Sequence, residues 1–202
     1  MRLEQKNRVM AELQMIRNQI HPVFLQDAMN ELYRVSNSRM EILPGMVLKL
    51  SEILNYLLFE CNSQEVNISG ELNAIERYLE FQKSAHEEQF NYQFHVKGDI
   101  SGERISPYIL FPLLRSACLF VESDNEDQGN LELSLEKKTN TLRLEILSER
   151  VKGPLHSVDF NWQDELSRAR KRINSVYYWN HKLDVMETDN KLTINFLIDF
   201  ER

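Results

Sequence analysis

The side chains able to do nucleophilic, acid–base or metal chemistry are scattered along the chain and form no familiar site. No two histidines have the spacing of a metal-ligand pair and no Cys-x-x-Cys occurs, so a zinc site is not predicted. The five histidines are His21, His86, His95, His156 and His181. Acidic residues crowd 122–127, but Leu135 stands at the twelfth position counted from Asp124, where a calcium loop needs glutamate. We interpret this stretch as a solvated acidic loop and expect no metal site.

Charge and composition exclude several classes of protein. The chain has 202 residues, of which 42% are hydrophobic and 27% charged, as in ordinary soluble globular proteins. A net charge of -7 argues against nucleic acid as a partner, since phosphate backbones are bound by clustered lysine and arginine. Cys61 and Cys118 each lie in an apolar run, which favours buried thiols in a reducing compartment and hence the cytoplasm.

The sequence shows neither a membrane-spanning segment nor an export signal. No apolar run approaches the roughly 20 residues of a membrane span. The first residues lack the apolar core of a signal peptide. We therefore expect no membrane span in this chain; that it is the inner part of a membrane-anchored sensor stays open.

The first third of the chain has the pattern of two long helices. Apolar residues recur at spacings of four and three over 3–36, and Pro22 should kink this helix. A second helix with a broad apolar face follows Pro44 and Gly45. Two helices cannot bury such wide stripes against each other alone, and the simplest partner is the same pair from a second chain. The pattern predicts a four-helix bundle formed by a homodimer.

Beyond this pair the hydrophobic period alternates between that of helices and that of strands. Helices are expected at 71–88, 105–121 and 163–179. Strands are expected at 90–96, 131–137, 142–147, 183–186 and 192–200. The strands form hairpins without a regular βαβ repeat. This order predicts an α+β fold, in which an N-terminal helical dimerisation bundle is followed by a two-layer α/β sandwich.

Four segments of the chain resemble, in order, the LytS-like sensor histidine kinases. Residues 19–30 (Gln-Ile-His-Pro-Val-Phe-Leu-Gln-Asp-Ala-Met-Asn) are similar to the family's phosphoacceptor box, Gln-Ile-Asn-Pro-His-Phe-Leu-Phe-Asn-x-Leu-Asn. The other three segments are 50–57, like the second bundle helix, 71–82, like the linker helix, and 105–114, like the run that enters the ATP-binding domain. The resemblance implies a dimerisation domain at 1–66 and a sandwich of the histidine-kinase ATPase type at 67–202.

The resemblance also locates the residues that would carry the family's chemistry. The phosphate-accepting histidine is matched by Val23, which has no nucleophile. His21 lies two residues earlier, about 200° around a helix, at the family's asparagine position before Pro22. We interpret His21 as a surface or capping residue, with a relocated acceptor as the alternative. Asp27 replaces a second asparagine and is expected at most to be a structural hydrogen-bonder.

The magnesium and phosphate positions that the resemblance implies are changed as well. The family's Glu-Asn pair, which polarises the chemistry and holds magnesium, is matched by Arg115 and Ser116. Arginine keeps its proton and cannot act as a base, and serine has a shorter reach to a metal. Phe120 replaces a polar or basic residue one turn later. We expect packing at this position and no phosphate binding.

The family's adenine-reading aspartate and its two glycine-rich loops have no counterpart in this chain. Ser148 and its neighbours follow the third strand, where the family has Asp-Asn-Gly-x-Gly. Gln163 and Glu165 stand at the later glycine positions, where backbone amides cradle phosphate in the family. Glu165 would compete with phosphate for the positive end of a helix. ATP and magnesium binding are therefore expected to be lost, and no catalytic or cofactor-binding residue is predicted.

Three hypotheses about function follow. The first is a pseudokinase of two-component signal transduction, acting by dimerisation and conformational relay without phosphotransfer, with a response regulator or a sensor protein as candidate partner. The second is a divergent but active sensor histidine kinase that uses His21 or another acceptor. The third is a ligand- or partner-binding module that uses the former ATP pocket, where Arg115 would favour an anion.

Overall fold

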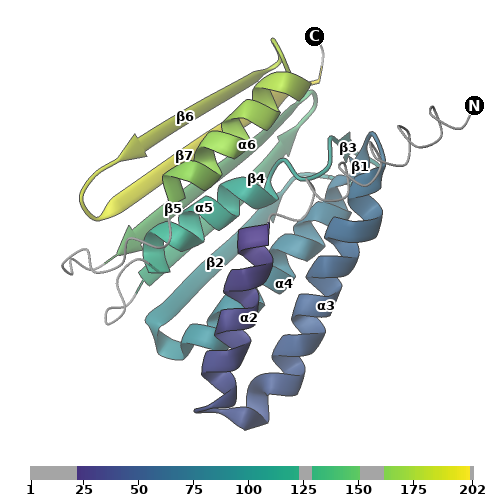
Figure 1. Cartoon of the computed structure of the whole chain (residues 1–202). Helices are drawn as coiled ribbons and strands as arrows, with labels where there is room; N and C mark the ends of the chain where they lie inside the picture. Colours follow the sequence, from purple (N-terminus) through teal and green to yellow (C-terminus); the bar gives the residue numbers. More distant parts are fainter. Residues whose placement is uncertain (1–21, 123–128, 151–161, 201–202) are drawn as a thin grey trace, which may run out of the picture.

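The computed structural model describes residues 22–122, 129–150 and 162–200 (Figure 1). The first part of the helix predicted over 3–36 lies outside the described residues, and so does His21.

Long helices make up the first part of the described chain. They are α2 (Pro22–Ser36), α3 (Leu43–Phe59) and α4 (Ile68–His86). Short 3-10 helices flank them: η1 (Met40–Ile42), η2 (Glu60–Asn62) and η3 (Glu87–Gln89). Helices α2 and α3 form an antiparallel hairpin, and α4 lies alongside α3 (Figure 1). Pro44 falls in the first turn of α3, where its missing N–H leaves no hydrogen bond unmade, so the helix begins just before Pro44 and not after Gly45.

A five-stranded mixed sheet follows in the order β2-β4-β5-β7-β6. Its strands are β2 (Phe90–Lys97), β4 (Gly129–Lys138), β5 (Thr141–Arg150), β6 (His181–Glu187) and β7 (Lys191–Asp199). Strand β2 is parallel to β4, and the other neighbouring pairs are antiparallel. A separate ladder pairs β1 (Val66–Asn67) with β3 (Arg104–Ile105). All five strands predicted from the alternating pattern are present, close to their predicted ends.

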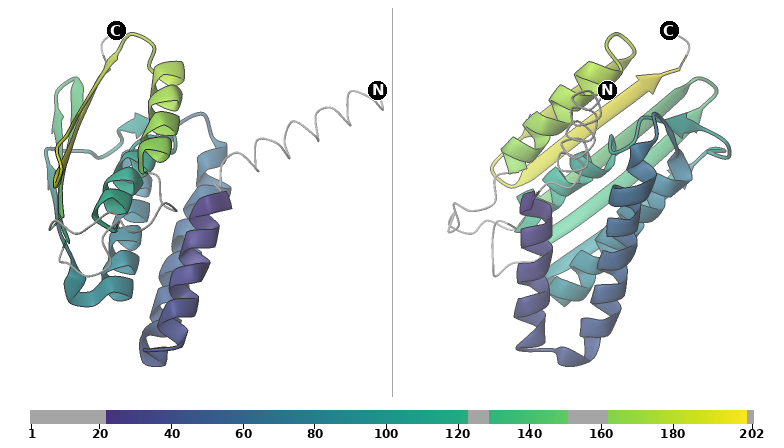
Figure 2. Two further views of the ribbon diagram at one scale, coloured as in Figure 1. Left: turned by 60° about the vertical axis from the view of Figure 1, so that its left-hand side comes forward. Right: turned by 45° about the vertical axis from the view of Figure 1, so that its right-hand side comes forward.

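Helices cover one face of the sheet. Together with α4, this layer contains α5 (Phe111–Glu122) and α6 (Trp162–Val176), and the α2–α3 hairpin packs outside it (Figure 2). The reason lies in the strands, where buried residues such as Leu131, Leu133 and Leu135 alternate with polar ones. A sheet with one apolar face must bury that face under another layer. The predicted α+β class, with helices followed by a two-layer sandwich, is confirmed.

One hydrophobic core extends from the hairpin to the sheet. It includes Phe24 of α2, Ile75 of α4 and Ile194 of β7. Because the hairpin shares this core with the sandwich, α2 is positioned by contacts with the sandwich as well as by α3. The division into domains at 1–66 and 67–202 stays a prediction.

The helix predicted over 105–121 begins later than its pattern indicates. Ile105 belongs to β3, and α5 starts only at Phe111. Tyr108, between them, has a φ of 59°, which a right-handed helix does not allow. The prediction of a helix opened by Ser106 and the following proline was therefore wrong.

Distant side chains hold this segment out of the helix. The backbone N–H of Ser106 donates to the Tyr177 hydroxyl at 2.9 Å. The Pro107 carbonyl accepts two hydrogen bonds from the Arg172 guanidinium, at 3.2 and 2.7 Å. These partners lie more than sixty positions away in the sequence, so a local pattern carries no sign of them.

The expectation that no apolar run approaches the length of a membrane span was wrong for residues 40–59. This stretch, η1 plus α3, is long and apolar enough to cross a membrane, and it is the one such helix in the described part of the chain. Length and composition alone are weak evidence for a membrane span, because core helices of soluble proteins can be equally long and apolar. In the structure it buries Met46, Ile53 and Leu57.

Candidate functional site

The position that matches the family's phosphate acceptor lies at the exposed start of α2. Val23 is 40% exposed and is the second residue of the helix. The position is thus accessible, but valine offers no atom that could attack a phosphate. His21, the neighbouring candidate, lies outside the described residues.

Arg115, at the position of the family's catalytic glutamate, is buried between three helices. Arg115 lies on α5 and is only 1% exposed. One guanidinium nitrogen donates to Asp27 Oδ2 of α2 at 2.6 Å, and another pairs with Glu165 Oε2 of α6 at 2.7 Å. The ring of Phe24 lies 5.6 Å from the guanidinium carbon. A buried charge needs such partners, because desolvating it unpaired costs several kcal/mol. We call Asp27, Arg115 and Glu165 the ion triad.

Burial raises the pKa of the Asp27 carboxyl above its usual value, and the Arg115 guanidinium only partly offsets this rise. The negative charges of Glu165 and Glu31 raise the pKa further. An ionised Asp27 carboxylate thus loses hydration when it docks, and the pairing with Arg115 offsets part of that cost. Asp27 is a hydrogen-bond partner of Arg115, as the expectation of a structural hydrogen-bonder has it.

Ser116, at the family's magnesium-binding position, has its hydroxyl engaged within its own helix. The side chain is fully buried, and Oγ donates to the Pro112 carbonyl one turn earlier at 2.8 Å. Serine commonly makes this bond inside helices. The oxygen that would have to reach a metal thus points back along α5.

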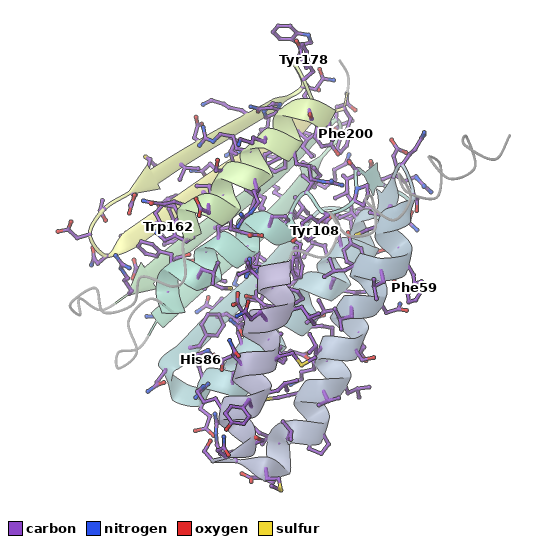
Figure 3. All side chains as sticks on the ribbon, viewed as in Figure 1. Phe59, His86, Tyr108, Trp162, Tyr178 and Phe200 are labelled. Atoms are coloured by element: carbon purple, nitrogen blue, oxygen red, sulfur yellow. The ribbon has the colours of Figure 1, made fainter. Side chains whose placement is uncertain are left out.

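Phe120, one turn after Ser116 on α5, packs against another aromatic ring. Phe120 is fully buried and meets Trp162 edge-on, with ring centres 5.7 Å apart. Trp162 lies at the start of α6 (Figure 3). The Arg150 guanidinium of β5 lies 4.3 Å from the Phe120 ring, a cation–π distance. Ser148, two residues before Arg150, is fully buried, and its hydroxyl has no hydrogen-bond partner among the described residues.

The two residues at the family's later glycine positions point in different directions. Gln163 is exposed in the first turn of α6, whereas Glu165 is 2% exposed and faces Arg115. Arg168, one turn later, reaches the same Glu165 carboxylate from solvent at 3.2 Å. Asp164 adds a second acid to this first turn. Carboxylates suit the positive end of a helix, and they occupy it at the expense of a phosphate.

The ion triad was not predicted, although its members were considered one at a time. Against the family pattern, an asparagine, a glutamate and a glycine have become Asp27, Arg115 and Glu165. The triad could have been predicted from the charges of these replacements, because one new cation occurs together with two new anions. A buried cation needs anionic partners, so opposite charges that appear together indicate contact.

Glu71 of α4, within the segment resembling the linker helix, anchors the start of α5. It is fully buried, and Oε1 accepts hydrogen bonds from the backbone N–H groups of Leu110 at 2.7 Å and Phe111 at 3.0 Å. The first N–H groups of a helix have no partner inside it, so Glu71 supplies one. Burial raises the pKa of this carboxyl, and the backbone bonds together with one from Tyr56 offset part of the rise.

Sensor proteins and sensor histidine kinases are among the known proteins that match this chain. The histidine kinase family model matches residues 11–90. Sensor protein LytS of Staphylococcus saprophyticus is 19% identical over 186 residues, covering 87% of this chain and 31% of LytS. Sensor histidine kinase BtsS of Escherichia coli is 23% identical over 136 residues, covering 67% of this chain and 24% of BtsS. The chain thus spans about a third or less of these relatives.

Solved structures of histidine kinases show a distant likeness. The catalytic domain of histidine kinase ThkA has a TM-score of 0.47 and 15% identity, covering 67% of this chain and 94% of that one. ThkA in complex with the response regulator protein TrrA has a TM-score of 0.46 and 15% identity, covering 98% and 63%. Values this low say nothing about activity.

The chain folds as a helical hairpin followed by a helix-covered mixed sheet, the α+β order that the resemblance implies. The family model over residues 11–90 and the relatives confirm the resemblance to the LytS-like sensor histidine kinases.

Proposed function

We propose that this chain is the signalling core of a two-component sensor histidine kinase relative that works as a pseudokinase. It acts by dimerisation and by a conformational change relayed between the hairpin and the sandwich, without ATP, magnesium or phosphotransfer. The observation that carries the proposal is the ion triad, which stands where the resemblance places a catalytic glutamate and a phosphate-binding glycine.

Arg115 supports this proposal in two ways. A guanidinium cannot lose its proton, so it cannot replace the glutamate as a base. Its positive charge is also met by Asp27 and Glu165, which leaves it poorly placed to attract a phosphate or another anion. The second point weighs against a module that binds anions through Arg115.

Nucleotide titration tests the proposal directly. We expect isothermal titration calorimetry of the full chain with magnesium-ATP to detect no binding tighter than about 1 mM, or about -4.1 kcal/mol. The buried Arg115, Ser116 and Phe120 leave no side chain at these positions for the phosphates or the metal. A parallel titration without magnesium is the control. Micromolar binding that requires magnesium would overturn the proposal.

The competing hypothesis of an active, divergent kinase has its own decisive experiment. Incubation with labelled ATP, followed by acid treatment, detects phosphohistidine because that bond is acid-labile. A labelled chain whose label is lost in His21→Ala would establish a relocated acceptor and end the pseudokinase proposal.

Dimerisation is supported by apolar side chains that the hairpin leaves exposed. Large ones are exposed on α2, η1 and α3: Val23, Met29, Tyr33, Met40, Val47, Leu48 and Phe59. Exposed apolar area is costly in water, at about 25 cal/mol per Å², and large exposed apolar areas mark interaction sites. A second hairpin would cover such side chains in a four-helix bundle.

Leu48→Glu should separate the dimer. Leu48 is 61% exposed on α3, and a two-fold interface would receive the new charge twice. We expect the dimer dissociation constant to rise by about 100-fold or more, or about 2.8 kcal/mol, in light scattering over a concentration series. Val96→Glu, at an apolar residue 42% exposed on the edge strand β2, is the matched control and should remain dimeric. A monomeric parent chain at micromolar concentration would contradict the proposed dimer.

The partner and the location follow from the same proposal. The relatives are named as sensor proteins and a sensor histidine kinase. A response regulator or an upstream sensor protein is therefore the proposed partner, and the cytoplasmic side of a membrane sensor is the proposed location.

A further inference from the structure

Helix α2 is held to the rest of the chain at two separated places. Near its start, Phe24 and Asp27 contact the sandwich. Near its end, Arg34 donates to the Ala85 carbonyl of α4 at 2.7 Å, and Arg39 of the following turn donates to the same oxygen. The two contacts have different chemistry, and this difference decides which of them can open.

The contact near the start of α2 combines a ring and a charge. Phe24 packs edge-on against Tyr78 of α4 and Phe111 of α5, with ring centres 6.0 and 5.9 Å apart. Asp27, one turn later, bonds Arg115 at 2.6 Å. Both side chains therefore belong to the same face of α2, and they would leave the sandwich together.

The two carboxylates of the ion triad differ in burial, and this difference favours release of Asp27. Arg115 keeps Glu165 at 2.7 Å when Asp27 leaves, so no unpaired charge stays buried in the sandwich. The Asp27 side chain is already 19% exposed and regains its hydration. Glu165, with a side chain 3% exposed, has no such route to water. Breaking the contact between Asp27 and Arg115 therefore costs less free energy than breaking the contact between Glu165 and Arg115.

The contact near the end of α2 resists opening. Two guanidinium groups converge on one carbonyl in the last turn of α4, where no intrahelical donor is available. Arg39 also pairs with Glu87, just beyond α4. This end of the hairpin stays attached when the Asp27 contact breaks.

We propose that Asp27 and Arg115 form a releasable latch. When it is closed, the latch holds the first half of α2 on the sandwich. When it is open, that half swings about the anchor formed by Arg34 and Arg39. In the proposed conformational relay, the contact between Asp27 and Arg115 is the one that opens and closes. The use of the latch in signalling rests on the proposed function, whereas its opening does not.

Asp27→Lys tests the latch by placing a second cation beside Arg115. In hydrogen exchange of the full chain, we expect the amides of residues 26–30 to exchange about tenfold faster or more, with α4 and α5 unchanged. A nitroxide pair at Asn30 and Arg170, with labelled chains diluted into unlabelled ones, should gain a longer distance. Gln26→Lys, which adds a cation at the exposed neighbouring position, is the matched control and should match the parent.

Asp27→Ala keeps the test decisive if the lysine variant does not fold. It removes the partner of Arg115 without adding charge, and it should also speed exchange at 26–30, by a smaller factor. Three outcomes would overturn the latch: unchanged exchange in both variants, an equal effect of Gln26→Lys, or equally faster exchange throughout α5. Magnesium-ATP binding by the parent would remove the proposed function but leave the latch standing, because the exchange measurement uses no nucleotide.

Discussion

Arg115→Met should lower the free energy of unfolding by about 3–5 kcal/mol, the usual cost of removing one partner from a buried ion pair. Methionine fills much of the space of the arginine stem, so the loss comes from charge. Glu165, only 2% exposed, would keep a buried carboxylate with Arg168 as its one remaining contact in the ion network. Urea denaturation followed by tryptophan fluorescence measures the change, since Trp162 lies on the same helix as Glu165.

Two further variants separate charge from packing. Arg168→Met removes a side chain that is 46% exposed and touches the same Glu165 carboxylate, and it should cost less than about 1 kcal/mol. Replacing the whole ion triad, as Asp27→Leu, Arg115→Met and Glu165→Leu, should recover most of the lost stability, because apolar replacements of buried ion networks are often neutral or stabilising. If the triple variant is as unstable as Arg115→Met, packing of the arginine stem explains the loss and the charges do not.

The strands of this fold could be predicted from the sequence more accurately than one of its helices. Strand β4 shows its buried face in every second residue, so the pattern alone gives its position. The start of α5 could not be predicted in this way. Residues 105–110 are apolar and contain a proline that suits a first turn. Their backbone N–H groups donate to Glu71 and Tyr177, and a carbonyl accepts from Arg172, and these bonds hold them out of the helix. A local pattern contains no information about partners that are distant in sequence.

The candidate site shows the same limit in its charges. That Arg115 replaces an acid could be predicted from the resemblance, and so could the poor reach of Ser116. That Arg115 bonds Asp27 of α2 depends on how the hairpin lies against the sandwich, and no spacing in the sequence gives that arrangement. The replacement of each residue could thus be read from the sequence one position at a time, whereas the contact between Asp27 and Arg115 required the fold.

Glu71→Leu has the second of the two largest expected effects, a loss of about 3 kcal/mol or more in the free energy of unfolding. It leaves the N–H groups of Leu110 and Phe111 unpaired in the core, and each unsatisfied buried donor costs about 1–3 kcal/mol. The start of α5 should fray, which exposes the turn that carries Arg115. Urea denaturation gives the total loss, and hydrogen exchange at 110–116 shows whether it begins there. Glu76→Leu, at an exposed glutamate of the same helix, is the matched control and should change stability little.

Glu71→Gln separates the hydrogen bonds from the charge, because glutamine keeps an acceptor oxygen but does not titrate. Burial raises the pKa of Glu71 above its usual 4.5. The folded chain therefore binds this proton more tightly than the unfolded chain does. The stability contributed by the carboxyl is complete below pH 4.5 and is lost as the pH rises through the raised pKa. We expect the parent to lose stability relative to Glu71→Gln as the pH rises above 4.5. Equal slopes would mean that the bonds from Leu110, Phe111 and Tyr56 hold Glu71 as a stable anion, so that α5 begins on a fixed negative charge.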